Sequence, residues 1–181
     1  MLGEEVADPL GVEGERAAEQ GLAAFRAMGA EVIRPNWLAL VAEAYGKVGQ
    51  TEEGLTVLAE ALATADKTGE RYYEAELYRL KGTLTLQSEV RGPASGVPNT
   101  QHPTPNTQEA EACFLKAIEI ARRQQAKSLE LRAAVSLARL WQQQGKKKEA
   151  RQILAEIYGW FTEGFDTKDL QEAKALLEEL T

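Results

Sequence analysis

The sequence predicts an all-α protein built from antiparallel helix pairs that stack side by side. Three observations lead to this prediction. Apolar residues recur at helical spacing along most of the 181 residues, glycines and prolines interrupt them at short intervals, and one pattern of small and large residues returns at a fixed period. Such a period is typical of repeat proteins, in which each repeat packs on its neighbours.

The repeated pattern places a large residue between two small ones, at the spacing of successive helix turns. Its clearest copy is Ala110, Phe114 and Ala117. Small side chains let two helix backbones approach closely, and the large side chain fills the gap beside them. The other copies are Gly54, Leu58 and Ala61, and Ala150, Leu154 and Ile157. Since the copies begin 56 and 40 residues apart, we expect one repeat to carry an insertion of 16 residues.

Helix boundaries follow from the residues that begin and end helices. Glycine ends four of the expected helices, at Gly29, Gly49, Gly69 and Gly145, because it adopts the left-handed cap conformation without strain. Pro35 suits the first turn of a helix, where its missing N–H costs no hydrogen bond. The expected helices cover residues 13–28, 36–48, 52–67, 70–87, 109–125, 128–144, 148–160 and 167–180.

Polar side chains are expected to cap two of these helices. Thr51 precedes one helix, and Asp166 or Thr167 precedes the last, where a side-chain oxygen can accept a free backbone N–H. The last helix carries a single apolar stripe, which is typical of a terminal helix that closes a repeat array. That stripe consists of Leu170, Ala173, Leu177 and Leu180.

A proline-rich stretch of about residues 90–107 separates the two halves of the middle pair. It holds four of the six prolines and repeats Pro-Asn-Thr-Gln, and it offers little apolar surface to offset chain ordering. We expect a disordered insertion there. The predicted organisation is a lead over residues 1–12 and one array over 13–181, made of a half repeat 13–29, repeats 35–69, 70–125 and 128–160, and a capping helix 166–181.

Composition favours a cytoplasmic protein with a sizeable core. The chain is 44% hydrophobic and 27% charged, with a net charge of −7, and Cys113 is its single cysteine, so no disulfide can form within it. The first residues are acidic where a signal peptide needs basic ones, and no apolar run approaches the roughly 20 residues that span a bilayer. We therefore expect no membrane partner.

At the repeated positions the chain resembles the tetratricopeptide repeat, in a long variety of about 40 residues. Small residues hold the close-contact positions throughout, whereas Lys81 and Thr85 depart from the motif. The matching positions are Leu38, Ala42, Tyr45, Gly54, Leu58 and Ala61 in the first pair, Tyr78, Gly82, Ala110, Phe114 and Ala117 in the second, and Ala134, Ala138, Trp141, Ala150, Leu154 and Ile157 in the third. The resemblance implies a right-handed α-α superhelix.

The long variety is similar to the C-terminal repeat region of bacterial signalling proteins that join a nucleotide cyclase or DNA-binding regulator domain to a signalling ATPase. The sequence itself has no phosphate-binding G-x-x-x-x-G-K-[ST] motif. The resemblance therefore implies a noncatalytic regulatory arm that docks a peptide or a neighbouring domain in its concave groove. By register, the groove should be lined by Asn36, Glu43, Lys47, Glu76, Arg79, Thr83, Gln87, Arg132, Arg139 and Gln143.

A nucleic-acid-associated regulator is the alternative function. Residues 116–151 hold ten basic and three acidic residues, and the basic end from Arg122 to Arg132 would contact phosphates, although the chain as a whole is acidic. The same basic end includes Arg123 and Lys127, and a second group lies at Lys146, Lys147 and Lys148.

Catalysis and metal binding are not expected. Cys113 has no nearby base in the sequence, and a buried hydrophobic role suits it better than a nucleophilic one. His102 is the single histidine and lies in the insertion, so we expect neither a metal site nor a cofactor. The helix over 13–28 has no predicted partner on its outer face. We therefore expect self-association or an upstream domain there, and a chain that is a fragment or a degenerate gene product of a longer protein.

Overall fold

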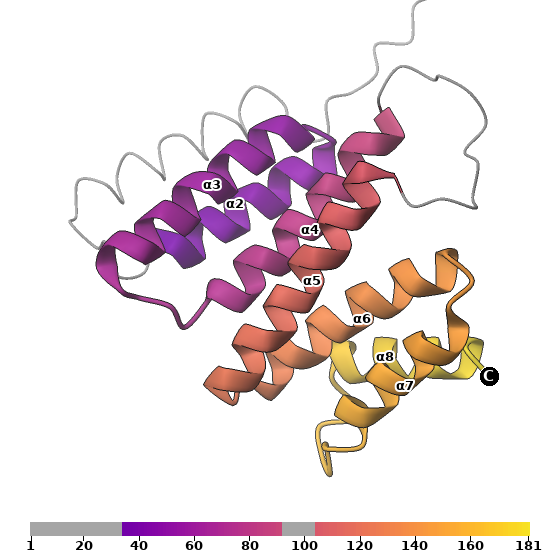
Figure 1. Cartoon of the computed structure of the whole chain (residues 1–181). Helices are drawn as coiled ribbons and strands as arrows, with labels where there is room; N and C mark the ends of the chain where they lie inside the picture. Colours follow the sequence, from indigo (N-terminus) through magenta and orange to yellow (C-terminus); the bar gives the residue numbers. More distant parts are fainter. Residues whose placement is uncertain (1–33, 92–103) are drawn as a thin grey trace, which may run out of the picture.

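The computed structural model describes residues 34–91 and 104–181, which form seven helices and no strand (Figure 1). The predicted all-α class is confirmed for this part of the chain. The helices are α2 (Arg34–Val48), α3 (Thr51–Thr68), α4 (Glu74–Arg91), α5 (Pro105–Gln124), α6 (Lys127–Gln143), α7 (Lys147–Tyr158) and α8 (Lys168–Glu179). The predicted lead, the helix over 13–28 and the middle of the predicted insertion lie outside the described residues.

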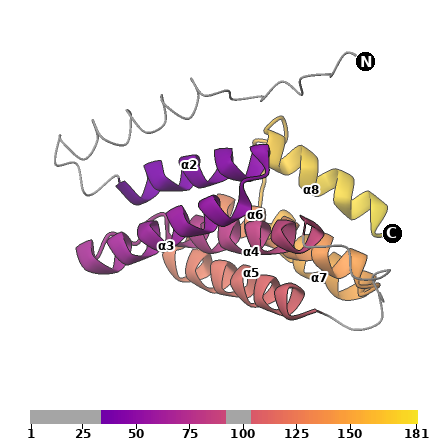
Figure 2. The same cartoon turned by 90° about the horizontal axis from the view of Figure 1, so that it is seen from above.

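The helices form two layers. Each helix packs on the next in the chain, and the alternate helices α2, α4, α6 and α8 also contact one another in succession. Figure 2 shows α3, α5 and α7 on the side opposite α2 and α8. The first helix of each pair therefore belongs to one layer, which we call the inner layer, and α8 extends this layer past the last pair.

Helix pairs meet at their smallest residues, as the repeated pattern predicts. A Cβ atom added to Gly82 of α4 would lie 3.0 Å from the carbonyl oxygen of Ala110 and 2.7 Å from Cε1 of Phe114 on α5. One at Gly54 of α3 would lie 3.2 Å from the carbonyl oxygen of Ala42 on α2. These distances leave no room for a side chain, so glycine sets the close approach of both pairs.

Two large apolar clusters, and a small one of Ala75, Ile120 and Ala121, fill the space between the layers. One joins α2, α3 and α4 through residues such as Leu38, Leu58 and Leu77. The other runs from α5 to α8 and contains Phe114, the largest fully buried side chain of the described residues. Side chains of α4 pack against both clusters, so α4 is the common wall between them.

The α5 boundary corrects the sequence prediction. The helix begins at Pro105 rather than at residue 109, because the hydroxyl of Thr104 accepts the backbone N–H of Thr107 at 3.2 Å and Pro105 occupies the first turn. At the other end of the predicted insertion, α4 continues to Arg91. Both ends of the range 90–107 are therefore helical.

Other boundaries differ less. Helix α4 begins at Glu74, four residues after the predicted start, and α7 ends at Tyr158, so Trp160 lies beyond it. Gly49, Gly69 and Gly145 have φ values of 80°, 74° and 77° at helix ends, which confirms the predicted glycine stops.

Neither Thr51 nor Thr167 caps its helix with a side-chain hydrogen bond, contrary to the prediction. Thr51 is a buried residue inside α3, and the preceding Gln50 makes no side-chain cap. Thr167 precedes α8 as expected, but its hydroxyl donates to the carbonyl of Gly164 at 2.7 Å instead of capping the helix. In α8, Leu176 is buried in place of the predicted Leu177, which is half-buried.

Candidate functional site

A cavity of about 510 Å³ opens along the inner layer. Its walls come from α2, α4, α6 and α8, and Phe114 of α5 contributes to its floor. Seven of the ten predicted groove residues line it, so the structure brings most of that set together. The lining residues are Glu43, Arg79, Thr83, Leu86, Gln87, Phe114, Arg132, Val135, Ser136, Arg139, Leu140, Gln143, Lys168, Asp169 and Glu172.

The cavity floor is apolar. Leu86 from α4, Phe114 from α5, and Val135 and Leu140 from α6 contribute to it. Phe114 is placed there by the close contact at Gly82, because its ring lies against that glycine. The same small residue that joins α4 to α5 therefore also positions the floor.

A buried carboxylate supports one end of the cavity. Glu76 is 2% exposed and lies behind the wall rather than in it. Its two oxygens accept Nε and Nη2 of Arg79 at 2.9 and 2.7 Å, and Nη2 of Arg132 lies 2.8 Å from Oε1. Two guanidinium groups from α4 and α6 are thus held by one carboxylate from α4.

This cluster shifts the pKa values of its members. Burial alone would lower the pKa of Arg79, but the hydrogen bond and the negative charge of Glu76 outweigh it, so the pKa is raised. The pKa of Tyr73 is raised first by burial and then by Glu76, while Arg132 opposes the shift. Arg79 therefore stays charged at physiological pH.

Helix α8 supplies charges that the sequence prediction missed. Glu172 Oε1 lies 2.8 Å from Nη2 of Arg139, and Asp169 Oδ2 lies 3.9 Å from Nε of Arg132. Lys168 lies beside them at the start of the helix. Helices alternate between the two layers along the chain, and this alternation places α8 in the inner layer. The alternation could therefore have identified Lys168, Asp169 and Glu172 as cavity residues from the sequence.

Three predicted groove residues do not line the cavity. Glu76 is buried beneath Arg79 and Arg132. Lys47 extends beside the cavity residue Glu43, with a 3.0 Å ion pair between them. Asn36 lies in the first turn of α2 and does not line the cavity.

The basic end considered for nucleic acid is paired with carboxylates. Arg122 contacts Glu130 at 2.7 Å and Glu156 at 3.2 Å, and its hydrogen bond to Glu130 raises its pKa despite opposing desolvation. Lys127 also contacts Glu130, at 2.8 Å, and Arg123 lies 3.8 Å from Glu119. Arg132 belongs to the Glu76 cluster. These pairs cancel much of the positive charge that the sequence concentrates there.

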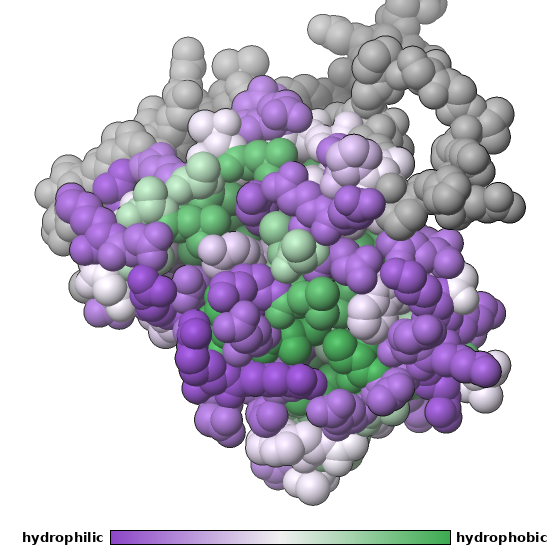
Figure 3. Space-filling model, in the orientation of Figure 1, coloured by the Kyte–Doolittle hydropathy of each residue, from purple (hydrophilic) through white to green (hydrophobic). Residues whose placement is uncertain are grey.

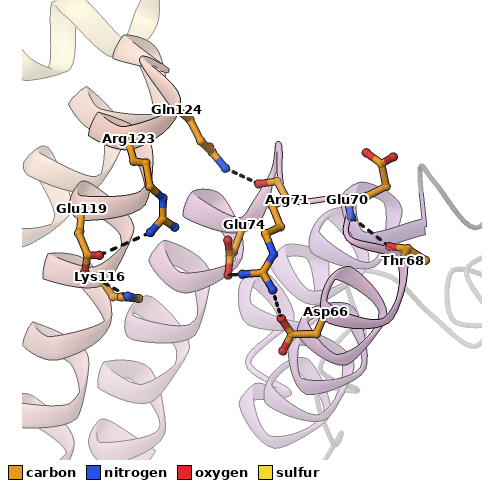
Figure 4. A network of polar contacts seen from close by, with 9 residues as sticks. All are labelled: Asp66, Thr68, Glu70, Arg71, Glu74, Lys116, Glu119, Arg123 and Gln124. Carbon is orange, nitrogen blue, oxygen red and sulfur yellow. Dashed lines mark hydrogen bonds and ion pairs between the residues drawn. The ribbon is translucent and has the colours of Figure 1, made fainter.

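A further polar network joins the α3–α4 turn to the end of α5 (Figure 4). Arg71 contacts Asp66 at 2.8 Å and Glu74 at 3.6 Å, and the side chain of Gln124 donates to the carbonyl of Arg71. None of these residues lines the cavity. This network therefore stabilises the α3–α4 turn and the end of α5, and it takes no part in the cavity.

Apolar surface also occurs away from the cavity. In the orientation of Figure 1, hydrophobic side chains reach the surface in patches near the middle of the visible face, with hydrophilic side chains around them (Figure 3). Within residues 34–91 and 104–181, the exposed large apolar residues are Leu40, Tyr72, Leu115, Trp160 and Phe165.

Cys113 is buried on α5, in agreement with a packing role. Burial raises the pKa of its thiol, while the positive charge of Lys81 opposes the shift. Across residues 34–91 and 104–181, no group of three or more acidic, histidine or cysteine side chains is arranged to hold a metal ion. In the same ranges, each helix is too short or too polar to cross a bilayer.

No family model matches the chain. The chain is similar to an uncharacterized protein of Rhizobium meliloti (strain 1021), with 30% identity over 128 residues. The match covers 70% of this chain and 11% of that protein. The chain thus spans about a tenth of the length of the relative it matches.

Proposed function

We propose that the chain is a noncatalytic protein-interaction module of the tetratricopeptide type. In this proposal its helix pairs form a right-handed superhelix, and the inner layer docks a peptide or a neighbouring domain in the cavity described above. The observation that carries the proposal is this cavity, because its walls come from four successive inner-layer helices and its charged rim surrounds an apolar floor.

Docking would act as a conformational bias. A ligand that contacts α4, α6 and α8 together favours the arrangement of helices in which these contacts form, and disfavours the others. In a longer protein, such a bias would pass to an attached domain. The match to a short part of the Rhizobium meliloti protein is compatible with a role as one arm of a larger bacterial signalling protein.

Peptide selection against the immobilised chain tests this proposal. Peptides that bind should lose affinity for a Ser136→Trp variant, because Ser136 lines the cavity and an indole there would fill it. The control is Gln152→Trp, on the exposed face of α7. Selected peptides that bind the wild type and both variants equally would show that the cavity is not the docking site.

The nucleic-acid alternative predicts a salt-dependent interaction with DNA that charge reversal at Arg122 and Arg123 abolishes. The carboxylate partners of these two arginines weigh against it, so the docking proposal is the one that the geometry supports best.

A further inference from the structure

A second cavity, of about 400 Å³, lies between α3, α4 and α5. It shares no lining residue with the groove cavity described above. Its wall from α4 includes Lys81 and Thr85, the two residues that depart from the repeat motif. The departures from the motif and the second cavity therefore occur at the same place in the chain.

In the next pair of helices, the position equivalent to Thr85 holds an indole ring. Trp141 of α6 follows Thr85 of α4 by 56 residues. The same separation relates Gly54 to Ala110 in the repeated pattern. The Trp141 ring packs against the core cluster that runs from α5 to α8, and its Nε1 donates to Oε1 of Glu111 at 2.9 Å. A ring therefore occupies on α6 the position where α4 has a threonine.

The neighbours of the Trp141 ring correspond to residues that line the second cavity. Glu111 follows Leu55 by 56 residues, and Leu55 lines the cavity. Lys146, whose Nζ lies 6.0 Å from the ring centroid, follows the lining residue Asn106 by 40 residues, which is the separation of the last two copies of the pattern. The second cavity thus occupies the place in one helix pair that the Trp141 ring fills in the following pair.

The wall of the second cavity combines apolar side chains with one buried hydroxyl group. Leu55, Ala59 and Leu62 of α3 form its apolar side, and the threonine at position 85 is 5% exposed. A small inorganic ion would leave the two leucines in water, so it would gain nothing from their burial. A purely aliphatic molecule would cover the hydroxyl group without offering it a hydrogen-bond partner, which is unfavourable. The wall therefore suits a flat apolar group that also has a polar edge.

Charged groups lie at the exposed edge of the second cavity. Lys81 Nζ lies 3.0 Å from Oε1 of Glu109, and the two side chains are 36% and 52% exposed. Glu52, in the first turn of α3, is exposed as well. An ammonium group beside an aromatic ring is favourable, and a carboxylate accepts a hydrogen bond from a ring N–H. The same two kinds of contact hold the Trp141 ring in the next pair.

We propose that the second cavity binds an indole-type ring, which is a planar bicyclic aromatic group with one N–H donor. The ring lies over Thr85 and against Leu55 and Leu62 of α3. Its N–H donates to a carboxylate at the exposed edge, and Lys81 faces the ring. This site is separate from the groove of the proposed function and does not rest on it.

The test measures binding of a ring-fluorinated indole to the full chain by fluorine NMR, because the protein itself contains no fluorine. Thr85→Trp should weaken binding about tenfold, since its own ring then takes the place of the ligand. Ala59→Leu introduces the residue that stands 56 positions later, at Leu115, and should weaken binding about fivefold by narrowing the cavity. The matched control, Ser136→Trp, adds the same side chain to the groove cavity and should leave binding unchanged. Circular dichroism verifies that each variant keeps its helices.

Two further ligands define the chemistry of the ring and its source. The N-methyl derivative of the fluorinated indole lacks the N–H donor and should bind about fivefold more weakly, as expected for one lost hydrogen bond. N-acetyl-tryptophanamide competes with the fluorinated indole for the site. Displacement at similar concentrations indicates a tryptophan side chain of a partner protein as the source of the ring, whereas exclusion indicates a free small molecule.

Three results would contradict the second site. The first is a fluorine signal that does not respond to the wild-type chain, and the second is binding that persists unchanged in both Thr85→Trp and Ala59→Leu. The third is loss of binding in Ser136→Trp alone, which would place the ring in the groove. Equal binding of the N-methyl derivative would refute the indole-type ligand. None of these results depends on peptide docking, so the two proposals fail separately.

Discussion

Glu76 on α4 and Glu130 on α6 are both 2% exposed and each receives two cations, but their surroundings differ. The cations of Glu76 come from α4 and α6 and face the cavity. Those of Glu130 are Arg122 and Lys127, which flank the turn between α5 and α6. Glu76 thus joins two inner-layer helices under a candidate binding surface, whereas Glu130 fastens a turn. Whether a buried carboxylate joins two helices or stabilises a turn thus depends on which elements supply its cations.

The largest expected effect separates these two carboxylates. Glu76→Gln should lower the free energy of unfolding by about 3 kcal/mol, because it leaves two little-exposed arginines without their anion. Glu130→Gln should cost about 1 kcal/mol, since Arg122 is 45% exposed and keeps Glu156 as a partner. Urea denaturation of both variants measures the difference. Equal losses would remove the distinction between the two sites.

The second prediction concerns the glycine that supports the cavity floor. Gly82→Ala should destabilise the protein by about 2 kcal/mol, because the added methyl group meets the Phe114 ring and the Ala110 carbonyl. Adding Phe114→Leu should recover part of this loss if the ring is the main obstacle. Thermal unfolding of the single and double variants provides the measurement, and a neutral Gly82→Ala would show that α4 and α5 do not approach as described.

A smaller effect should distinguish arginine from lysine at the two sites. Arg79→Lys should cost about 1 kcal/mol, because the two-point contact with Glu76 needs the fork of a guanidinium group. The reverse change, Lys127→Arg, should leave stability nearly unchanged, since Lys127 makes a single contact with Glu130. Denaturation midpoints for this pair sharpen the comparison, and a larger loss at Lys127 would contradict it.

The smallest expected effect is a pH dependence of stability that arises from Tyr73. Because the pKa of Tyr73 is raised above 10.0, the unfolded chain loses the phenol proton at a lower pH than the folded chain does. Stability should therefore fall as pH rises through about 10 toward the folded-state pKa. Tyr73→Phe should flatten this fall slightly, whereas Tyr72→Phe, at an exposed ring, serves as the control. Identical pH profiles for both variants and the wild type would exclude a contribution from Tyr73.

Much of the helical arrangement could be predicted because its cause is local and repeated. The spacing of Gly82, Ala110 and Phe114 is visible in the sequence, and the same spacing sets the contact between α4 and α5. Glycine stops at Gly49 and Gly69 were predictable for the same reason, because the conformation they need belongs to the residue itself.

The cavity was only partly predictable because its details depend on contacts between helices. Register placed Glu76 and Arg79 on one face of α4, but the sequence does not reveal that Arg132 of α6 completes a buried cluster around Glu76. The contribution of Asp169 was missed because α8 was interpreted solely as a closing helix. Likewise, the start of α5 depends on Thr104, which lies within a proline-rich stretch that composition alone predicts to be disordered.

Helix α4 has a consequence for how the molecule melts. Its Leu77, Leu80 and Leu84 complete the cluster of α2 and α3, while Tyr78 and Leu86 pack against the cluster that extends to α8. The two larger apolar clusters of the described residues therefore meet at α4. We expect that unfolding of the helices at either end weakens the packing on α4 but leaves the opposite end folded. Heat capacity measurements should then show a broad or double unfolding transition, whereas a single globular core would produce one sharp peak.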